Sequence, residues 1–473
     1  MSLIAIAAVG WSTSGWSAEN QWDISPYDVQ VWIAYEAVPE ITVWRDRLPP
    51  RLRHELHLRS GAGWATNVNV APAAVARVTL TEFDNVDASL IEEHAPEAFA
   101  ADKLFLVRLA TASGQITCTV RELDCRTRIW SASVERQITH NRQLPKDLAD
   151  LIFATFSPIA LIGRVEDKSV SIRMRAGLLD LNSTTPIIVD KGAMLRVVLR
   201  KSDRLGVPIP GGIEIVPWTV LIAQAAADRS PATGAVPCEI VSGLRNPIRS
   251  RGSRRVERLA LVVRPRHQQT RLELHARGDV AHKLAGYDVY ARLPNEKNTQ
   301  LIGRSDWQGQ LEIERDEHPL KILYVKNGGR LLARLPLVIG DQRNLTAELT
   351  DDNLRLEAEG FLRGLQEEFV DLVVRRKLLA MRIRRRVEEN KLAAAELLLD
   401  EMRRLETRQG LERRIRERQA AFQTRDKAQQ DLINRLFRDT RSLLQKHLDQ
   451  REIDALRDEL ARAQPGQRVA SPK

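Results

Sequence analysis

Aromatic residues, cysteines and long apolar runs are all scarce in this chain of 473 residues. Phe, Trp and Tyr make up 5% of it, which leaves few rings for the stacking of nucleic-acid bases. No apolar run reaches the roughly 20 residues that a membrane-spanning helix needs. Of the three cysteines, Cys118 and Cys125 lie too far apart along one predicted hairpin to form a disulfide, and Cys238 falls in another domain. We expect three unpaired, half-buried thiols, which do not identify a compartment.

Sequence signatures of catalysis are also missing. The chain contains no G-x-x-x-x-G-K-[ST], no G-x-G-x-x-G and no G-x-S-x-G segment. His54-Glu55-Leu56-His57 has its histidines three residues apart, whereas the zinc motif H-E-x-x-H needs four. We therefore predict no catalytic residues, no cofactor and no metal, and we expect a protein that is not an enzyme. A cryptic hydrolase stays open as an alternative, because two carboxylates can converge from distant parts of a chain.

Basic residues are in excess, and the chain begins with a short apolar run. Lys and Arg number 72 against 62 Asp and Glu, a net charge of +10, which suits nucleic acid, anionic lipid or acidic polymers alike. Residues 1–18 combine the apolar segment Leu3–Val9 with small residues after it. This pattern is typical of a signal peptide, so we expect a periplasmic or otherwise exported protein.

The clearest folding signal runs from Asp102 to Pro158. Lys103–Leu109 is apolar on both faces, which predicts a covered, central strand. Beyond the turn signal Ser113-Gly114, residues 116–120 alternate as in a half-buried strand. An amphipathic helix opens at Leu144-Pro145. With the strands and helices expected upstream, this stretch predicts an α/β sandwich domain over residues 27–158.

A family resemblance rests on the segment "FAADKLFLVRLATASGQITCTVRELDCRTRIWSASV" and the helix that starts "LPKDLADLI". This part of the chain resembles the amino-terminal domain of the translocation protein TolB and related domains of curli-secretion lipoproteins and penicillin-binding-protein activators. One departure is Arg128, which stands where the family usually has a glycine after the threonine. The resemblance implies a binding or assembly module of the cell envelope.

Two further β domains are expected after it. Alternating segments punctuated by glycine over residues 159–250 predict a small β-barrel or sandwich. A basic linker follows at 246–258, which is either a solvated loop or an anion-binding strip; its candidate anion-binding residues are Arg249, Arg251, Arg254 and Arg255. Residues 259–349, with "AGYDVYARLP" and the turn "SDWQG", resemble a prealbumin-like or carboxypeptidase-regulatory-like β-sandwich. Such modules are typically accessory and extracytoplasmic.

The remaining residues lose all strand signals. Apolar residues stepping by three and four over 351–463 predict long antiparallel helices, a hairpin or short bundle, with a turn at Gln409-Gly410 and a disordered tail at 464–473. The fold class is thus multidomain α+β. Arg376 falls in the apolar seam, while a separate set of arginines shares an outer helix face as a predicted partner-binding site: Arg375, Arg382, Arg385 and Arg386.

These patterns favour a non-catalytic exported scaffold that docks partners in the cell envelope. The expected partner is an envelope protein or an anionic envelope polymer, and oligomers can form through the C-terminal helices. The alternative of a different class is a nucleic-acid-binding protein that uses the arginine-rich helices; the low aromatic content argues against it.

Overall fold

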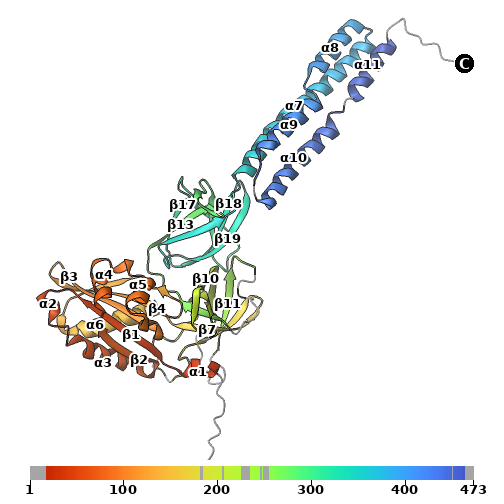
Figure 1. The fold of residues 1–473 in the computed structure, drawn as a ribbon. Helices are drawn as coiled ribbons and strands as arrows, with labels where there is room; N and C mark the ends of the chain where they lie inside the picture. The colour runs from red at the N-terminus through yellow and green to blue at the C-terminus, as the bar shows by residue number, and fades with distance from the viewer. Residues whose placement is uncertain are drawn as a thin grey trace, which may run out of the picture. The chain divides into compact units, whose positions relative to one another are not determined.

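The computed structural model describes residues 18–179, 181, 185–204, 207–224, 235–245, 248, 255–424, 426–449 and 451–463. The predicted leader (apart from Ala18) and the predicted tail lie outside these residues. The chain divides into two compact units, which are Met1–Leu274 with Ala285–Lys326 and Leu331–Ala347, and His275–Leu284 with Asn327–Arg330 and Glu348–Lys473. The predicted multidomain α+β class is confirmed, since several β-sheets precede a set of long C-terminal helices (Figure 1).

A mixed sheet forms the N-terminal domain. Its strand order is β2-β1-β3-β4-β5, with β6 paired to β4. The strands are β1 (Tyr27–Tyr35), β2 (Trp64–Val70), β3 (Lys103–Ala112), β4 (Gln115–Asp124), β5 (Ile129–Trp130) and β6 (Val134–Ile138). Strand β1 runs parallel to β2 and β3, and β3 pairs antiparallel with β4. The prediction of a central strand at β3 is confirmed, because β3 lies between β1 and β4 and is buried on both faces.

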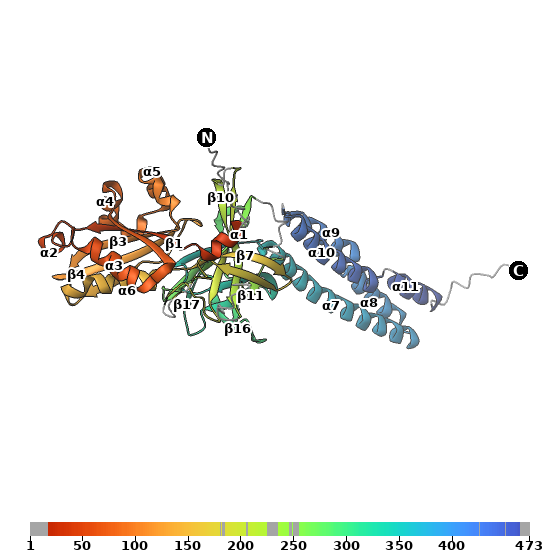
Figure 2. The same ribbon diagram turned by 90° about the horizontal axis from the view of Figure 1, so that it is seen from below.

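Helices cover both faces of this sheet (Figure 2). On one face, α3 (Leu48–Ser60) and α6 (Leu144–Thr155) pack onto Val31, Val107 and their neighbours. On the other face, α4 (Ala73–Thr81) and α5 (Ala88–His94) pack onto Trp32 and Leu106. Two short helices, α1 (Ala18–Ile24) and α2 (Pro39–Thr42), complete the domain. Successive side chains of a strand point to opposite faces, so each of the two central strands supplies both cores.

The turn between β4 and β5 contains the departure from the family pattern. Arg128 has a φ of 57°, the left-handed conformation that glycine adopts without steric cost. Its guanidinium lies 3.6 Å from the centre of the Phe99 ring and 3.0 Å from the Glu92 carboxylate. These contacts offset the conformational cost of a side chain at this position.

Six strands then close into a β-barrel in the order β10-β11-β8-β7-β12-β9. They are β7 (Ile159–Glu166), β8 (Ser169–Met174), β9 (Met194–Ser202), β10 (Pro208–Ala223), β11 (Ala235–Ser242) and β12 (Val256–Val262). Two sequence predictions are wrong here. The segment from Leu259 does not begin the next β domain, and Val256–Arg258 is not linker; both belong to β12, which pairs with β7 and β9 and closes the barrel. Closure leaves no open edge between these two strands.

The next domain consists of two four-stranded sheets. One has the order β14-β13-β17 with β20 on β13, and the other has the order β16-β15-β18-β19. The strands are β13 (Gln269–Ala276), β14 (Asp279–Lys283), β15 (Asp288–Arg292), β16 (Gln300–Arg304), β17 (Gln310–Glu314), β18 (Leu320–Asn327), β19 (Arg330–Val338) and β20 (Asn344–Leu349). At the predicted turn, Gly309 has a φ of 72° and the Asp306 carboxylate accepts from the Gln308 and Gln310 amides. The prealbumin-like identity of this domain stays a prediction.

The C-terminal region contains five helices that pack around two separate apolar cores. The helices are α7 (Asn353–Glu388), α8 (Leu392–Arg404), α9 (Arg408–Ala421), α10 (Lys427–His447) and α11 (Arg451–Ala463). The first half of α7 packs with α9 and α10, and its second half packs with α8 and α11. None of the helices in the described residues combines the length and the apolarity of a membrane span.

The two cores meet at Arg376. Its side chain is buried, as predicted for a seam residue, and one guanidinium N–H donates to the Glu406 carbonyl at 3.1 Å. That carbonyl lies where the chain passes from α8 to α9. The predicted turn at Gln409-Gly410 is wrong, because the interruption comes earlier and the Thr407 hydroxyl caps α9 by accepting from the Gly410 amide.

Burial of Arg376 generates a stability prediction. Its pKa is lowered by burial, and Nε has no hydrogen-bond partner among the described residues, so the charge is poorly compensated. We expect Arg376→Met to leave the free energy of unfolding unchanged or raise it by about 1 kcal/mol. Arg376→Ala should lower it by about 2 kcal/mol, because it also removes the buried hydrocarbon stem. Chemical denaturation measures both, and a methionine variant less stable than the alanine variant contradicts this account.

Candidate functional site

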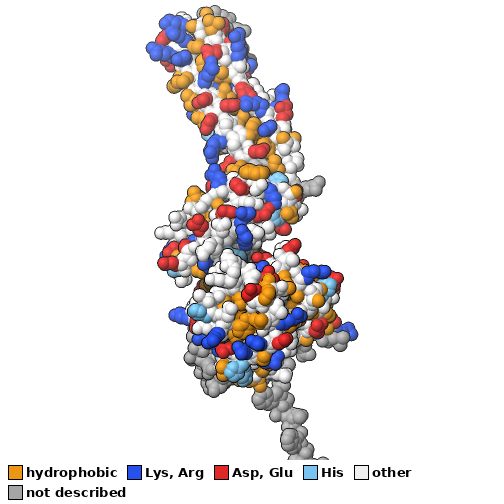
Figure 3. All heavy atoms as spheres, turned by 90° about the vertical axis from the view of Figure 1, so that its left-hand side faces the viewer, with side chains coloured by type: hydrophobic (Ala, Val, Ile, Leu, Met, Phe, Trp, Pro, Cys, Tyr) orange, Lys and Arg blue, Asp and Glu red, His pale blue; other side chains and the backbone are white. Residues whose placement is uncertain are grey.

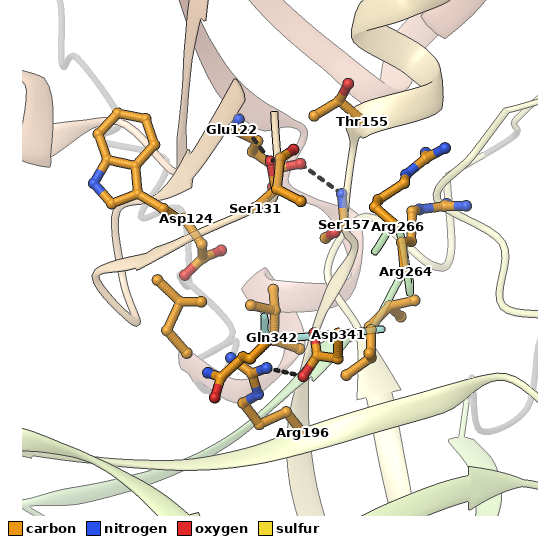
Figure 4. Close-up of a pocket in the computed structure, with 16 residues that line it drawn as sticks. Glu122, Asp124, Ser131, Thr155, Ser157, Arg196, Arg264, Arg266, Asp341 and Gln342 are labelled. Atoms are coloured by element: carbon orange, nitrogen blue, oxygen red, sulfur yellow. Dashed lines mark hydrogen bonds and ion pairs between the residues drawn. The ribbon is translucent and has the colours of Figure 1, made fainter. Parts of the chain in front are cut away.

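A small polar cavity lies in the first unit, where the α/β domain, the barrel and the β-sandwich contribute side chains (Figure 4). Glu122 and Asp124 from β4 lie on one side, and Arg264 and Arg266, which follow β12, lie on the other. Its volume of about 60 Å³ exceeds the roughly 10–15 Å³ that one water occupies, so it has room for a few waters or a very small polar ligand.

A buried cluster of three charges stands behind the acidic wall. The Lys103 side chain is fully buried, and its Nζ lies 2.6 Å from a Glu122 oxygen and 2.8 Å from an Asp124 oxygen. The ammonium also donates to the carbonyl of Ser157, and the Ser157 amide donates to the other Glu122 oxygen at 2.7 Å. Lys103 thus has hydrogen bonds to Glu122 and Ser157 and an ion pair with Asp124. The cluster ties the central hairpin to the segment that enters the barrel.

One ammonium faces two carboxylates, so the cluster carries one excess negative charge when all three groups are ionised. Burial raises the pKa of Glu122 to about 7, although the Lys103 ammonium opposes the shift. Burial disfavours the ammonium form of Lys103, but Asp124 and Glu122 outweigh this effect and raise its pKa. Protonation of Glu122 makes the cluster neutral, and this is the charge state that a buried site favours.

The arginine wall binds the end of α6. Arg264 Nε donates to the Phe156 carbonyl at 2.6 Å, and Arg266 donates to the Ala154 carbonyl. Burial lowers the pKa of Arg264, and the nearby Glu122 charge acts in the opposite direction. The last carbonyls of a helix lack partners within the helix and carry partial negative charge, so cations stabilise them. These arginines therefore fasten α6 to the chain that leaves the barrel.

Other polar groups of the cavity also bond to neighbouring protein groups. Ser131 Oγ accepts from the Glu122 amide at 2.9 Å and donates to the Ala132 carbonyl at 3.1 Å. Arg196 pairs with Asp341 on the floor of the cavity. The residues that line the cavity include no histidine and no cysteine. Within the described ranges, no group of three His, Cys, Asp or Glu side chains is placed to hold a metal ion. The contacts of this cavity join chain segments.

The Lys103 cluster was missed in the sequence, although a signal for it exists. Strands β3 and β4 are joined by the tight turn Ser113-Gly114, which the sequence predicts. Counting outward from this turn pairs Lys103 with Asp124, as the structure does. A lysine opposite an aspartate at the covered end of a hairpin predicts an ion pair. Its second carboxylate, Glu122, and its carbonyl partner depend on tertiary packing.

The predicted arginine sites have different outcomes. Arg249, Arg251 and Arg254 lie outside the described residues. Arg255 is exposed in the turn before β12 and is already engaged in an interaction. The linker belongs to the first unit and α7 belongs to the second.

The helix-face arginines all lie on α7, and most of them have an acidic neighbour. Arg375 lies 2.9 Å from Glu401, while Arg385 and Arg386 lie 3.0 and 2.8 Å from Glu389. Arg382 is exposed and has no ion-pair partner in the part of the chain that the structure describes. Exposed pairs of this kind are worth about 0–1 kcal/mol, so an incoming carboxylate can replace them. Figure 3 shows the mixture of basic, acidic and hydrophobic side chains on one face of these helices.

Apolar residues on the outer side of α7 were not predicted from the sequence. Val370, Val374, Leu378 and Met381 are exposed, and they step along the helix by four, four and three residues. This spacing matches a second apolar face, opposite the seam. It was overlooked because the seam itself accounts for a stable helix.

Comparisons with known proteins assign no family to the chain. No protein-family model matches the chain, and no curated protein matches it. The crystal structure of TolB from Acinetobacter baumannii is similar at 14% identity, covers 69% of this chain and 96% of that chain, and has a TM-score of 0.20. A likeness at this TM-score supports no inference about fold or function, so the resemblance of residues 27–158 to the TolB amino-terminal domain stays a prediction.

The charge cluster predicts a large loss of stability on removal of its cation. Lys103→Met leaves Glu122 and Asp124 buried without their ammonium, so the free energy of unfolding should fall by about 3–5 kcal/mol. The matched control is Arg164→Gln, since Arg164 is 84% exposed and 3.8 Å from Glu166, and it should change stability by less than about 0.5 kcal/mol. Equal effects of the two substitutions in urea denaturation contradict a structural role for the cluster.

The raised pKa of Glu122 predicts a pH dependence. The folded state keeps the proton up to about pH 7, whereas the unfolded state loses it near the ordinary glutamate pKa of 4.5. This contribution to stability is complete below pH 4.5 and is lost as the pH rises to 7, by about 3 kcal/mol. Glu122→Gln has no titrating group there, so its stability relative to the native protein should increase over this range. A difference between the two proteins that is flat from pH 4.5 to 7 contradicts the shift.

Proposed function

We propose that the protein is an exported, non-catalytic component of the cell envelope that docks a partner protein through its helical unit. The apolar leader at residues 1–18 motivates the periplasmic location. The predicted accessory type of the domains before the helices motivates the role of a scaffold.

The observation that carries the proposal is the outer surface of α7. Arg382 has no ion-pair partner among the described residues, and the neighbouring arginines are held only by exposed glutamates. Guanidinium groups bind carboxylates through two parallel hydrogen bonds, which gives both energy and orientation. The surface therefore fits an acidic partner.

A protein fits this surface better than a polymer or a nucleic acid. Val374 and Leu378 lie exposed on the same helix, and a partner that covers them must offer apolar side chains as well as acids. Neither a polyanion nor a phosphate backbone supplies this apolar surface. The chain also has few aromatic residues for base stacking.

Neutralising three arginines tests the proposal. Arg382→Gln, Arg385→Gln and Arg386→Gln in one variant should leave the fold intact, because these side chains lie on a solvent-facing part of a helix. Capture of envelope proteins by the tagged variant from native extract should fall, and the loss should be greater at low salt, where charges are least screened. Captured proteins are identified by mass spectrometry.

A matched control removes the same charge elsewhere in the helical unit. Arg413→Gln, Arg416→Gln and Arg435→Gln change exposed arginines of α9 and α10, and capture should stay as in the native protein. Equal capture by both variants overturns the docking role of α7. Arginine-dependent capture of nucleic acid or glycan, with no protein, supports a different partner class.

A further inference from the structure

Helix α7 is apolar on two opposite faces, and only one of them is covered. The covered face includes Leu365, Leu379 and Ile383 within the helical cores. On the opposite face lies an outer stripe, which we define as Val370, Val374, Leu378 and Met381; these side chains are 56, 52, 47 and 57% exposed. Contiguous apolar side chains on a solvent-facing helix mark an interaction surface more often than a random surface does.

The charges at the ends of the outer stripe have opposite signs. Glu367 and Asp371 lie toward its N-terminal end, and Arg382 and Arg385 lie toward its C-terminal end. Glu367 and Arg385 are 18 residues apart (385 − 367), which is five turns at 3.6 residues per turn, so both lie in line with the stripe. Asp371 and Arg382 are 11 residues apart (382 − 371), about three turns, so both lie on the same flank of the stripe.

These acids have no partner within the described part of the helical unit. Neither Glu367 nor Asp371 has a basic group within ion-pair distance there, and Arg382 has no acidic one. Arg385 is paired only with Glu389, through an exposed contact. The stripe therefore carries charges of both signs that are available to an incoming surface.

We propose that the outer stripe binds the same stripe of a second copy of this chain, with the two α7 helices antiparallel. Two pairs of stripe residues share one midpoint in residue number: positions 367 and 385 average to 376, and positions 374 and 378 also average to 376. A two-fold axis at this level places Val374 against the partner's Leu378. It also places Glu367 near the partner's Arg385 and Asp371 near the partner's Arg382. Each contact then occurs twice, as an isologous interface requires.

Charge selects this arrangement over the parallel one. Two parallel copies in register place Glu367 beside Glu367 and Arg382 beside Arg382, and like charges directly opposite each other repel. The antiparallel pairing instead brings together opposite charges at both ends of the stripe. Lys377 lies near the two-fold axis and faces the partner's copy of the same residue, so its charge opposes association. The inference rests on the docking role proposed above and specifies a second copy as the partner.

Charge reversal in the purified full-length protein tests the inference. The base variant carries Glu367→Arg and Asp371→Arg; the acid variant carries Arg382→Glu and Arg385→Glu. Sedimentation equilibrium should show self-association of each weakened on the order of tenfold or more. An equimolar mixture of the two should associate as a heterodimer, and a single chain with all four changes should regain self-association. Circular dichroism checks that each variant keeps its helices.

Substitutions of exposed apolar residues by glutamine complete the test. Val374→Gln with Leu378→Gln should abolish self-association, whereas Leu397→Gln, which changes a 72% exposed leucine of α8, should not affect it. Lys377→Gln should strengthen it. A native protein that stays monomeric at high concentration, or a charge-reversed mixture that does not associate, overturns the inference. Because only purified chain is present, that result leaves arginine-dependent capture of other envelope proteins to be judged separately.

Discussion

The ion cluster of Lys103, Glu122 and Asp124 is the constraint on which the first unit depends. It joins strands β3 and β4 of the α/β domain to Ser157, at the entrance to the barrel. A second tie runs beside it, since the Tyr27 hydroxyl accepts from the Ile159 amide at 3.1 Å. The arginines after β12 then bind the end of α6. Polar contacts with defined geometry therefore fix the passage between domains, where apolar packing alone would permit sliding.

The two units use arginine in different ways. In the first unit, Arg264 is half-buried and donates a hydrogen bond to the Phe156 carbonyl, so its role is structural. In the second unit, Arg382 and its neighbours are exposed on α7 and have weak partners or none among the described residues. Composition shows only that arginine is abundant. The environment of each side chain decides whether it holds the fold together or remains available for a partner.

Local patterns predicted much of the fold. The double apolar face of β3 and the seam of α7 were predicted correctly, because each follows from one element and its period. The prediction of a half-buried strand at residues 116–120 was wrong, because Thr117 and Thr119 on its polar face are buried as well. The assignment of β12 failed, because a strand with two apolar faces fits a barrel and a sandwich equally well. The turn predicted at Gly410 was wrong because this residue lies in the first turn of α9, where a helix tolerates a single glycine. The cavity could not be predicted from the sequence, because residues as far apart in the chain as Asp124 and Asp341 line it.

The interruptions in the helical unit have a consequence for its cooperativity. Helix α7 continues without a break past Arg376. The helices packed against it are interrupted, between α8 and α9 and between α10 and α11. Each half therefore has its own apolar core. The far half, α8 with α11 and the end of α7, can open while the near half stays folded. Its backbone amides should exchange with solvent as a separate, less protected set.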